Sequence, residues 1–506
     1  MKRIINFLII SCLIFTGACN KFLDEKPTSF ISPGTKLSSY KVARAFADGC
    51  YQNTTGFDMG SGGYGGNTWV LMEFMTGKTR TDLGQTGFNT FQTLTYNNSS
   101  FYFDTWWQQM YLGIGACNLA IQELPSITAP DMSDEQRTNM LAEAHTMRAL
   151  YYFYLVRMYG AVPMVTKVPS STTELKPSRT PAKSIYDSII IPDLLLAEKS
   201  TLSWSDVAGR ISLGAIESIL ADVYLTYAGA AINGGQQYYA ESAKRSLNVV
   251  QNGGYTQFPN YTDMNNPSNK NKGEFIFQVQ FSASANVNNP LTALNLPNYS
   301  GISGYSDEYG SVWPDSAFVA SFPAGDKRIQ QKQYLYYSYP SHKNGALVTF
   351  THPYIYKWFD SLAVNSTLKS DLNYTLYRLA DVKLMYAEAS NRAEGSPNAT
   401  AIQYVNDIRG RANLSPIGTL SQTDFEHEVW SQRNFELCFE NKMWFDMVRT
   451  RKVYDDYAHA WVDFVGYTPD PLKNPTTKYT EKQLLFPVPL VEINANSNLL
   501  PNNTGF

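Results

Sequence analysis

Cysteine is scarce in this chain, with five residues among 506. Cys12 lies in an apolar stretch near the N-terminus, and Cys19 follows a Gly-Ala pair. If that first stretch is removed and Cys19 is acylated, only Cys50, Cys117 and Cys438 remain, an odd number with no close spacing. The sequence therefore predicts neither a disulfide framework nor a Cys-x-x-Cys metal site.

The chain also has no excess of positive charge. Its 41 Lys and Arg residues stand against 44 Asp and Glu residues, which gives a formal net charge of -3 and a pI near 6.0. Proteins that follow nucleic-acid phosphates usually concentrate Lys and Arg on one strongly basic face. We therefore expect no nucleic-acid partner.

Catalytic motifs are missing as well. His427 begins no HExxH motif, because Ser431 stands at the second histidine position, and the sequence contains no GxSxG, Walker or DxDxDG motif. Gly60, Gly62 and Gly65 fit GxGxxG, but no strand is predicted before them, so we interpret this segment as a flexible loop. We expect a protein that is not an enzyme and that binds neither a cofactor nor a metal ion.

A surface glycosidase is the least favoured hypothesis. Such an enzyme needs two carboxylates at a fixed separation across the sugar, and nothing singles out a pair among the 44 acidic residues. Several charged residues lie among apolar ones on predicted helices, where a buried charge without a partner is costly. We interpret them as internal salt bridges between helices: Glu143, Arg148, Arg378, Asp381, Glu388, Arg433, Glu436, Glu440, Asp446 and Arg449.

No apolar run reaches the roughly 20 residues that a membrane-spanning helix needs. Residues 1–18 combine a basic start, an apolar run over 4–15 and small residues at the end, which is the pattern of a secretion signal. The next residue, Cys19, resembles the acylated cysteine of a bacterial lipobox, with Thr16 where that motif usually has Leu. We predict lipidation of Cys19, with an ordinary secretory cut as the alternative, and a flexible lipid-anchored tether over residues 19–36.

Aromatic side chains are abundant: 34 Tyr, 27 Phe and 9 Trp make up 14% of the chain. A sugar ring has an apolar face of C–H groups and a rim of hydroxyls, which suits a flat Trp or Tyr beside polar residues. The alternative is that each aromatic residue fills the core beneath its loop. The aromatic residues in loop-like contexts are Trp69, Phe88, Phe91, Tyr96, Tyr299, Tyr305, Tyr309 and Trp313. Of these, we predict Trp69, Tyr299, Tyr305 and Trp313 as ligand-binding residues, and we place Trp106, Trp107, Trp358, Trp430 and Trp444 in the core.

Helical periodicity covers most of the remaining chain. Residues 255 to about 350 differ, being rich in Asn, Ser, Pro and Gly, with one strand-like run at 274–281. Because two amphipathic helices joined by a short turn cannot bury their apolar faces alone, we expect helix pairs that stack as in tetratricopeptide arrays. A capping box at Thr423 and Glu426 predicts the start of the last long helix. The predicted helices span 38–51, 106–124, 142–159, 213–229, 238–250, 374–392, 399–412 and 423–449.

Several segments together resemble the SusD/RagB family of outer-membrane lipoproteins from Bacteroidetes. They occur in family order and bracket nearly the whole chain after the signal. The segments are CNKFLDEKP (19–27), AEAHTMRALYYFYLVRMYGAVPMV (142–165), GRISLGAIESILADVYLTYAG (209–229), YRLADVKLMYAEASNRAEG (377–395), VNDIRGRANL (405–414), RNFELCFENKMWFDMVR (433–449) and LLFPVPLVEINANSNL (484–499).

The resemblance implies a mainly α fold, in which about four tetratricopeptide-like helix pairs support a loop-rich lobe with minor β structure. The SusD-like domain would span 37–506, with the ligand-binding lobe inserted at roughly 255–350. The resemblance also implies a lipid-anchored protein on the outer surface of the cell outer membrane, acting in nutrient uptake as a lid over a SusC-like TonB-dependent transporter. Oligosaccharide is the implied ligand, and peptide, as in RagB-like members, is the alternative. These motifs identify scaffold, so they transfer no ligand-binding residue.

Overall fold

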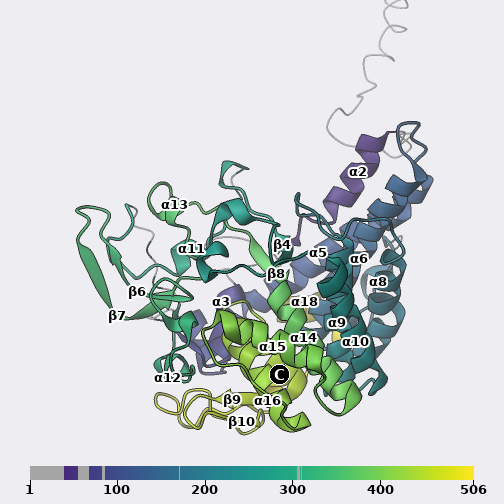
Figure 1. Ribbon diagram of the computed structural model, residues 1–506. Coiled ribbons are helices and arrows are strands. Elements are labelled where there is room, and N and C mark those ends of the chain that lie inside the picture. The colour runs from purple at the N-terminus through teal and green to yellow at the C-terminus, as the bar shows by residue number, and fades with distance from the viewer. Residues whose placement is uncertain are drawn as a thin grey trace, which may run out of the picture.

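The computed structural model describes residues 39–506, apart from gaps at 55–67, 82–85, 170, 172, 286, 305–307, 309 and 311. Long helices form the body, and a loop-rich lobe with short strands lies beside them (Figure 1). The predicted mainly α fold with tetratricopeptide-like pairs and minor β structure is confirmed. Within the described ranges, no helix is both long and apolar enough to cross a membrane.

Consecutive long helices pack against one another in pairs, and the pairs pack side by side. Three such pairs are α5 (Phe101–Glu123) with α6 (Asp134–Tyr159), α9 (Leu213–Ala228) with α10 (Gln237–Asn252), and α14 (Leu379–Glu394) with α15 (Ala399–Arg411). Helix α10 also packs on α14, and α6 packs on α8 (Ile191–Ala197) and on α2 (Tyr40–Gly49). The stacking therefore links the N-terminal and C-terminal halves of the chain.

Serine side chains set the starts of several helices. The Ser133 hydroxyl accepts a hydrogen bond from the backbone N–H of Gln136, whose side chain accepts one from the Ser133 N–H, so α6 begins with a capping box. The last predicted long helix is capped differently from the expectation. Ser421, not Thr423, accepts from the N–H of Asp424, and α16 (Gln422–Glu436) begins one residue before Thr423. The predicted cap at Thr423 is therefore wrong.

The predicted single helix over 423–449 is also wrong, because the chain turns between α16 and α17 (Met443–Thr450). Phe439 and Asn441 have φ angles of 65° and 55°, which a right-handed helix does not contain. The Asn441 N–H donates a hydrogen bond to Glu73 Oε1 at 2.9 Å. This partner is far away in sequence, so the helical pattern of 423–449 carries no signal for the break.

A strand replaces the beginning of another predicted helix. Residues Tyr374–Arg378 form β8, and α14 begins only at Leu379. The run predicted as strand-like at 274–281 does contain β4 (Phe275–Val279), and β4 pairs antiparallel with β8. The Tyr-Thr-Leu-Tyr stretch at 374–377 alternates in a way that suits a strand, and the pairing with β4 decides between strand and helix.

The remaining strands form four antiparallel pairs, some of them in the loop-rich lobe. Its core is a second cluster of buried apolar residues that includes Ile302, Tyr336 and Phe359. The pairs are β1 (Thr79–Arg80) with β5 (Trp313–Pro314), β6 (Leu335–Pro340) with β7 (Leu347–Ile355), β9 (Lys452–Asp455) with β10 (Ala460–Asp463), and β2 (Val162–Pro163) with β3 (Arg179–Thr180). The short helices α3 (Thr68–Met75), α4 (Thr86–Gln92), α7 (Ala182–Ile185), α11 (Leu291–Leu294), α12 (Ser316–Ala320), α13 (Ser361–Val364) and α18 (Leu490–Ala495) connect these parts.

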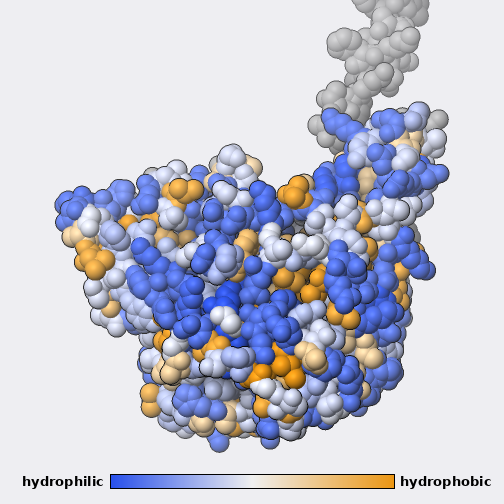
Figure 2. Space-filling view, in the orientation of Figure 1, coloured by the Kyte–Doolittle hydropathy of each residue, from blue (hydrophilic) through white to orange (hydrophobic). Residues whose placement is uncertain are grey.

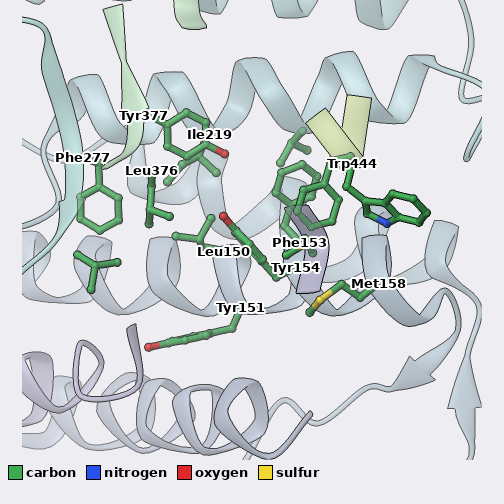
Figure 3. Packing of buried hydrophobic residues seen from close by; sticks show 14 of the residues in the cluster. Leu150, Tyr151, Phe153, Tyr154, Met158, Ile219, Phe277, Leu376, Tyr377 and Trp444 are labelled. Carbon is green, nitrogen blue, oxygen red and sulfur yellow. The ribbon is translucent and has the colours of Figure 1, made fainter. Parts of the chain in front are cut away.

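On the face shown in Figure 2, hydrophilic residues predominate and hydrophobic ones gather in small separate groups. Much of the aromatic content lies inside instead. Leu150, Tyr154 and Met158 of α6 point toward Ile219 of α9 and Trp444 of α17 (Figure 3). All five tryptophans predicted for the core are buried: Trp106, Trp107, Trp358, Trp430 and Trp444.

The charged residues predicted to form internal salt bridges do so, all ten of them. Arg378, only 1% exposed, is the centre of the largest group, with Glu274, Glu436 and Glu440 each within 3.0 Å of its guanidinium nitrogens. The other pairs between helices are Arg44 with Glu143, Arg148 with Asp193, Arg433 with Asp381 and Asp446, and Arg449 with Glu388, while Arg449 also pairs with Asp446 within α17. These charges are therefore scaffold.

Glu73 on α3 is a buried carboxyl at the edge of this charged group. Burial raises its pKa to about 7, and the nearby Glu440 adds to the rise, against the hydrogen bond from Asn441 and the charge of Lys357. In the unfolded chain the carboxyl ionises near its model value of 4.5, so the unfolded state binds fewer protons between about pH 4.5 and 7. The free energy of unfolding should therefore fall as the pH rises through this window.

We expect Glu73→Gln to remove this pH dependence. Gln keeps an oxygen that accepts from Asn441 but never ionises. The free energy of unfolding of the variant minus that of the wild type should be about 2–3 kcal/mol larger at pH 8 than at pH 4. Urea denaturation at both pH values measures the change, with the exposed Glu481→Gln as control. An equal difference at both pH values would show that Glu73 is ionised in the folded protein.

Candidate functional site

The structure places two of the four predicted ligand-binding side chains. Tyr299 is 82% exposed on a turn of the loop-rich lobe, with a φ of 48°. Trp313 is half-buried in β5. Trp69 lies on α3, which leads into β1, the partner strand of β5, but its side chain is outside the described part of the structure. Tyr305 also lies outside the described residues, as does Tyr309.

Neighbouring side chains hold the Trp313 ring in place. Its indole stacks on the His352 imidazole, with 4.0 Å between ring centroids and an interplanar angle of 24°. His352 in turn contacts Tyr354, and Lys473 Nζ lies 5.9 Å from the Trp313 ring centroid. Indole Nε1 is buried and has no hydrogen-bond partner among the described residues. The stacking holds the ring in one orientation.

Salt bridges fix the strand that carries Trp313. Arg80, opposite Trp313 in the β1–β5 pair, bonds Asp315 through Nε at 2.9 Å and Asp470 through a terminal nitrogen at 3.2 Å. Asp315 caps α12 by accepting from the N–H groups of Ala317 and Phe318. Because Arg80 is only 5% exposed, these ion pairs are shielded from water and hold β5 to the segment near residue 470.

An open depression of about 720 Å³ lies along the β9–β10 hairpin and the segment after it. Its wall includes Tyr457, which is 47% exposed, and Tyr467, together with the carboxylates of Asp455 and Asp463. The lining continues to Leu472, next to the Lys473 that approaches Trp313. Because Lys473 follows this lining directly, we include the β9–β10 hairpin and the segment after it in the candidate site. Sequence reasoning missed this stretch, although its aromatic and acidic residues, YDDYAHAWVDFVGYTPD at 454–470, were a signal for it.

The two tyrosines of the depression remain neutral phenols. Burial and then the charge of Asp315 raise the pKa of Tyr457, while burial and then Asp456 raise the pKa of Tyr467. Each hydroxyl can therefore both donate and accept a hydrogen bond at neutral pH. With the carboxylates of Asp455 and Asp463 as acceptors, the depression presents groups that match the hydroxyl rim of a sugar. Within the described ranges, no group of three or more His, Cys, Asp and Glu residues could hold a metal ion.

A buried carboxylate shapes the loop that carries Tyr299. Glu308, 3% exposed, accepts hydrogen bonds from the Gly301 and Ser303 N–H groups and from the Ser300 hydroxyl. Ile302 on the same loop belongs to the core of the loop-rich lobe, against which Trp313 also packs. The structure thus brings Tyr299 and Trp313 onto one lobe, with the loop of Tyr299 held in place from beneath.

Three aromatic residues grouped with them by loop context belong to the main core instead. Phe88 and Phe91 are 0% exposed and Tyr96 is 2% exposed. Phe91 stacks on Tyr96 with 5.1 Å between centroids. Phe88 and Phe91 lie on α4, a short helix whose other residues are glycine, threonine, asparagine and glutamine, so the segment resembles a loop. For these three residues, the alternative interpretation is correct: each ring fills the core beneath a surface segment.

A second hollow lies on the helical side of the molecule. This groove, of about 640 Å³, runs between α5, the 163–177 segment and the C-terminal segment. Two large apolar side chains of its lining are exposed, Leu112 at 58% and Leu175 at 62%, and Val491, next to the lining residue Glu492, is 59% exposed. We call it the α5 groove. Exposed apolar patches of this kind often mark surfaces that another protein covers.

Comparisons with known proteins agree with this architecture. A family model described as "SusD family" matches residues 308–506, and one described as "Starch-binding associating with outer membrane" matches residues 21–225. A crystal structure of a SusD superfamily protein from Parabacteroides distasonis is 48% identical, covers 93% of this chain and 100% of its own, and has a TM-score of 0.88. The chain belongs to the SusD family.

Other relatives of this SusD family member are more distant. "SusD-like protein P2" of Formosa agariphila is 26% identical, with 100% of both chains aligned. A solved structure described as a laminarin-binding SusD-like protein is 22% identical, covers 93% of this chain and 100% of its own, and has a TM-score of 0.74. At that identity, the likeness shows the shared fold alone.

Proposed function

We propose that this SusD family member is a surface-exposed lipoprotein of the outer membrane that captures oligosaccharide and delivers it to a SusC-like TonB-dependent transporter. The observation that carries the glycan assignment is the Trp313 ring, which stacks on His352 and which Lys473 approaches from the segment that lines an open depression with tyrosine and aspartate residues. An indole face suits the C–H face of a sugar, and the polar wall suits its hydroxyls. Tyr299 on the same lobe offers a second exposed ring.

Family membership supports the same proposal. One solved relative is described as binding laminarin, a glycan. The open shape of the depression favours a chain-like ligand that passes across it, because a closed pocket would limit the length of the ligand. An open platform buries little of its ligand, so we expect weak affinity, and multiple sugar units in contact would be needed for specificity.

The competing functions predict different results. A peptide-binding lid would bind mixed peptides and no glycan, whereas a surface glycosidase would release reducing sugar. The buried carboxylates of the helical body are held in salt bridges, which argues against their use as a catalytic pair. We therefore propose binding without turnover.

Calorimetric titration with a glycan panel and a peptide mixture tests this function. The panel should include laminarin oligosaccharides, other β-linked and α-linked glucans, and xylan fragments. We expect heat and a change in Trp fluorescence with at least one glycan, no heat with peptides, and no reducing sugar after prolonged incubation. Binding of peptides alone would favour the peptide-binding lid, and release of reducing sugar would contradict the non-enzyme assignment.

Delivery requires a surface for the transporter. The α5 groove supplies exposed apolar side chains that such a partner could cover, on the helical side of the molecule rather than at the Trp313 ring. Co-purification from membranes tests the partnership. A TonB-dependent β-barrel should co-elute with the wild type in detergent, and Leu112→Asp should weaken the association. A protein that elutes alone at native expression levels would contradict it.

Lipid attachment is tested at Cys19. The predicted anchor consists of several acyl chains, and each buried CH₂ contributes about 0.8 kcal/mol to membrane binding, so the wild type should sediment almost entirely with membranes. Cys19→Ala removes the acylated thiol, and most of the variant should appear in the soluble fraction. Cys12→Ala is the matched control, since it lies within the predicted signal and should leave fractionation unchanged. Cys19→Ala protein that still sediments with membranes would rule out this anchor.

A further inference from the structure

The outward face of α5 carries no charge. The helix has no charged side chain between Asp104 in its first turn and Glu123 at its end. The exposed residues of this stretch are Gln108, Leu112, Gly115, Leu119 and Gln122. They follow one another at four- and three-residue spacing, so they form one stripe along the helix. A helix face that meets water usually carries charged residues, so this stripe is typical of a face that another molecule covers.

The α5 groove shares residues with this stripe. Gln108, Tyr111 and Leu112 contribute to its lining from α5, and Leu175 and Ala495 contribute from the two segments that complete it. Leu112 and Leu175 are both more than half exposed. A segment of a partner that lies along the groove would cover both leucine side chains. Because the burial of apolar surface is favourable, this contact would stabilise the complex.

Two carboxylates lie at the groove, close to the start of α5. Glu492 of α18 belongs to the groove lining, and Asp104 is in the first turn of α5. Helix α18 packs on α5, and the Leu490 N–H donates a hydrogen bond to the Asn98 carbonyl oxygen at 2.8 Å, so α18 begins beside the start of α5. Gln108 Nε2, from the same lining, donates to both Asp104 carboxylate oxygens at 3.0 and 3.1 Å. Asp104 and Glu492 are therefore neighbours at this part of the groove.

Neither carboxylate has a cation for a partner. Among the described residues, no Lys, Arg or His forms a salt bridge with Asp104 or Glu492. Elsewhere in the lining, Glu174 pairs with Lys167 at 2.9 Å, and Lys176 lines the groove without pairing with either carboxylate. Burial, and then the charge of Asp104, raises the pKa of Glu492. A Lys or Arg between the two carboxylates would offset their repulsion, so the groove favours a cationic side chain at this place.

We infer that the α5 groove receives a segment of the partner transporter in which a Lys or Arg accompanies apolar residues. The inference rests on the delivery step of the proposed function and adds the chemistry of the partner at its docking surface. The cationic side chain binds between Asp104 and Glu492, and the apolar side chains cover Leu112 and Leu175. Because the charged contact lies near the start of α5, it fixes the direction in which the segment lies along the helix. Charge complementarity of this kind selects the partner and speeds its association.

Co-purification from native membranes in detergent tests the charged contact. Glu492→Lys puts a cation of the protein's own beside Asp104, so the variant should fold and carry about tenfold less transporter than the wild type. Glu492→Gln removes one charge without adding another and should carry several-fold less. Glu123→Lys, the matched control, makes the same charge reversal at the other end of α5 and should carry the wild-type amount. Circular dichroism and Tm establish that each variant folds.

The outcomes separate this inference from the proposed function. Transporter that co-elutes with folded Glu492→Lys and Glu492→Gln as it does with the wild type overturns the inference and leaves delivery intact. A wild type that elutes alone overturns both the inference and delivery, whereas glycan binding is measured independently. A differently tagged second copy of this chain, recovered in place of the transporter, also overturns the inference, because the groove would then join two copies.

Photo-cross-linking identifies the segment that occupies the groove. The photoreactive residue p-benzoylphenylalanine, placed at the position of Leu112, reacts in membranes with whatever covers this position, and digestion with chymotrypsin yields the linked peptide. Leu112 lies about 12 Å along α5 from Asp104, at a rise of about 1.5 Å per residue. We therefore expect a transporter peptide with a Lys or Arg within about eight residues of the linked residue. A linked segment without Lys or Arg over that span would contradict the inference.

Discussion

Replacing Arg378 with Met is expected to lower the free energy of unfolding by about 3–5 kcal/mol. Its guanidinium bonds Glu440 at 2.9 and 3.0 Å, Glu436 at 2.9 Å and Glu274 at 3.0 Å, and it also donates to the Glu436 backbone carbonyl. Met fills a similar volume but leaves one buried carboxylate of this group without a compensating charge. Because whole domains are stable by only about 5–15 kcal/mol, much of the variant should fail to fold.

Urea denaturation of soluble protein measures the loss, and the folded yield reports it if the variant aggregates. Arg137→Met is the matched control: Arg137 pairs with the exposed Asp134 on the surface of α6, where such pairs contribute less than about 1 kcal/mol. A second variant, Arg378→Met with Glu440→Gln, removes one carboxylate along with its partner and should recover part of the stability. A loss below about 1 kcal/mol for Arg378→Met would mean that the cluster is not what holds β8, α16 and the turn after α16 together.

The scaffold could be predicted from the sequence because its signals are local. The apolar spacing of α6 and the glycine and proline that follow it lie within one stretch, and the capping serines stand next to the helices they begin. The salt bridges were also predictable as a class, since a charge on an otherwise apolar helix needs a partner. What could not be predicted was which residues pair. Arg378 meets Glu274 across more than 100 positions of the chain.

Two of the wrong predictions, the helix from 374 and the single helix over 423–449, have the same origin. The residues of β8 form a strand because β4, about 100 residues earlier, pairs with them. The turn between α16 and α17 forms around Glu73, Glu436 and Glu440, one of which lies more than 360 residues away. The spacing of apolar residues in a short stretch of sequence carries no information about such distant partners. Periodicity alone therefore predicted both helices too long.

The candidate site was predictable only in part. The exposure of Tyr299 and the partial exposure of Trp313 could be predicted, because aromatic residues in polar surroundings are often exposed, and their role in ligand binding stays a prediction. The same argument failed for Phe88, Phe91 and Tyr96, because burial depends on what covers a segment. His352 and Lys473 belong to the site only through contacts that form in the folded chain.

Loss of the Trp313 ring should have the largest effect on ligand binding. Its indole, braced by His352, is the apolar face on which a sugar would stack, and burial of such a face contributes about 1.5–3 kcal/mol. Trp313→Ala should therefore raise the Kd for the preferred oligosaccharide by about 10- to 100-fold. His352→Ala leaves the indole but removes the imidazole that stacks on it, so we expect a smaller, several-fold rise in Kd.

Trp204→Ala is the matched control, because Trp204 is also half-buried but lies in the helical body, where its carbonyl oxygen accepts from Tyr255. Circular dichroism and Tm establish that each variant folds before binding is measured.

The most direct test of glycan capture at this ring is calorimetric titration of wild type, Trp313→Ala and Trp204→Ala with the best-binding oligosaccharide of the panel. We predict that Trp204→Ala binds as the wild type does and that Trp313→Ala binds at least tenfold more weakly. Equal affinity of folded Trp313→Ala and wild type would contradict the assignment of the glycan site to this lobe.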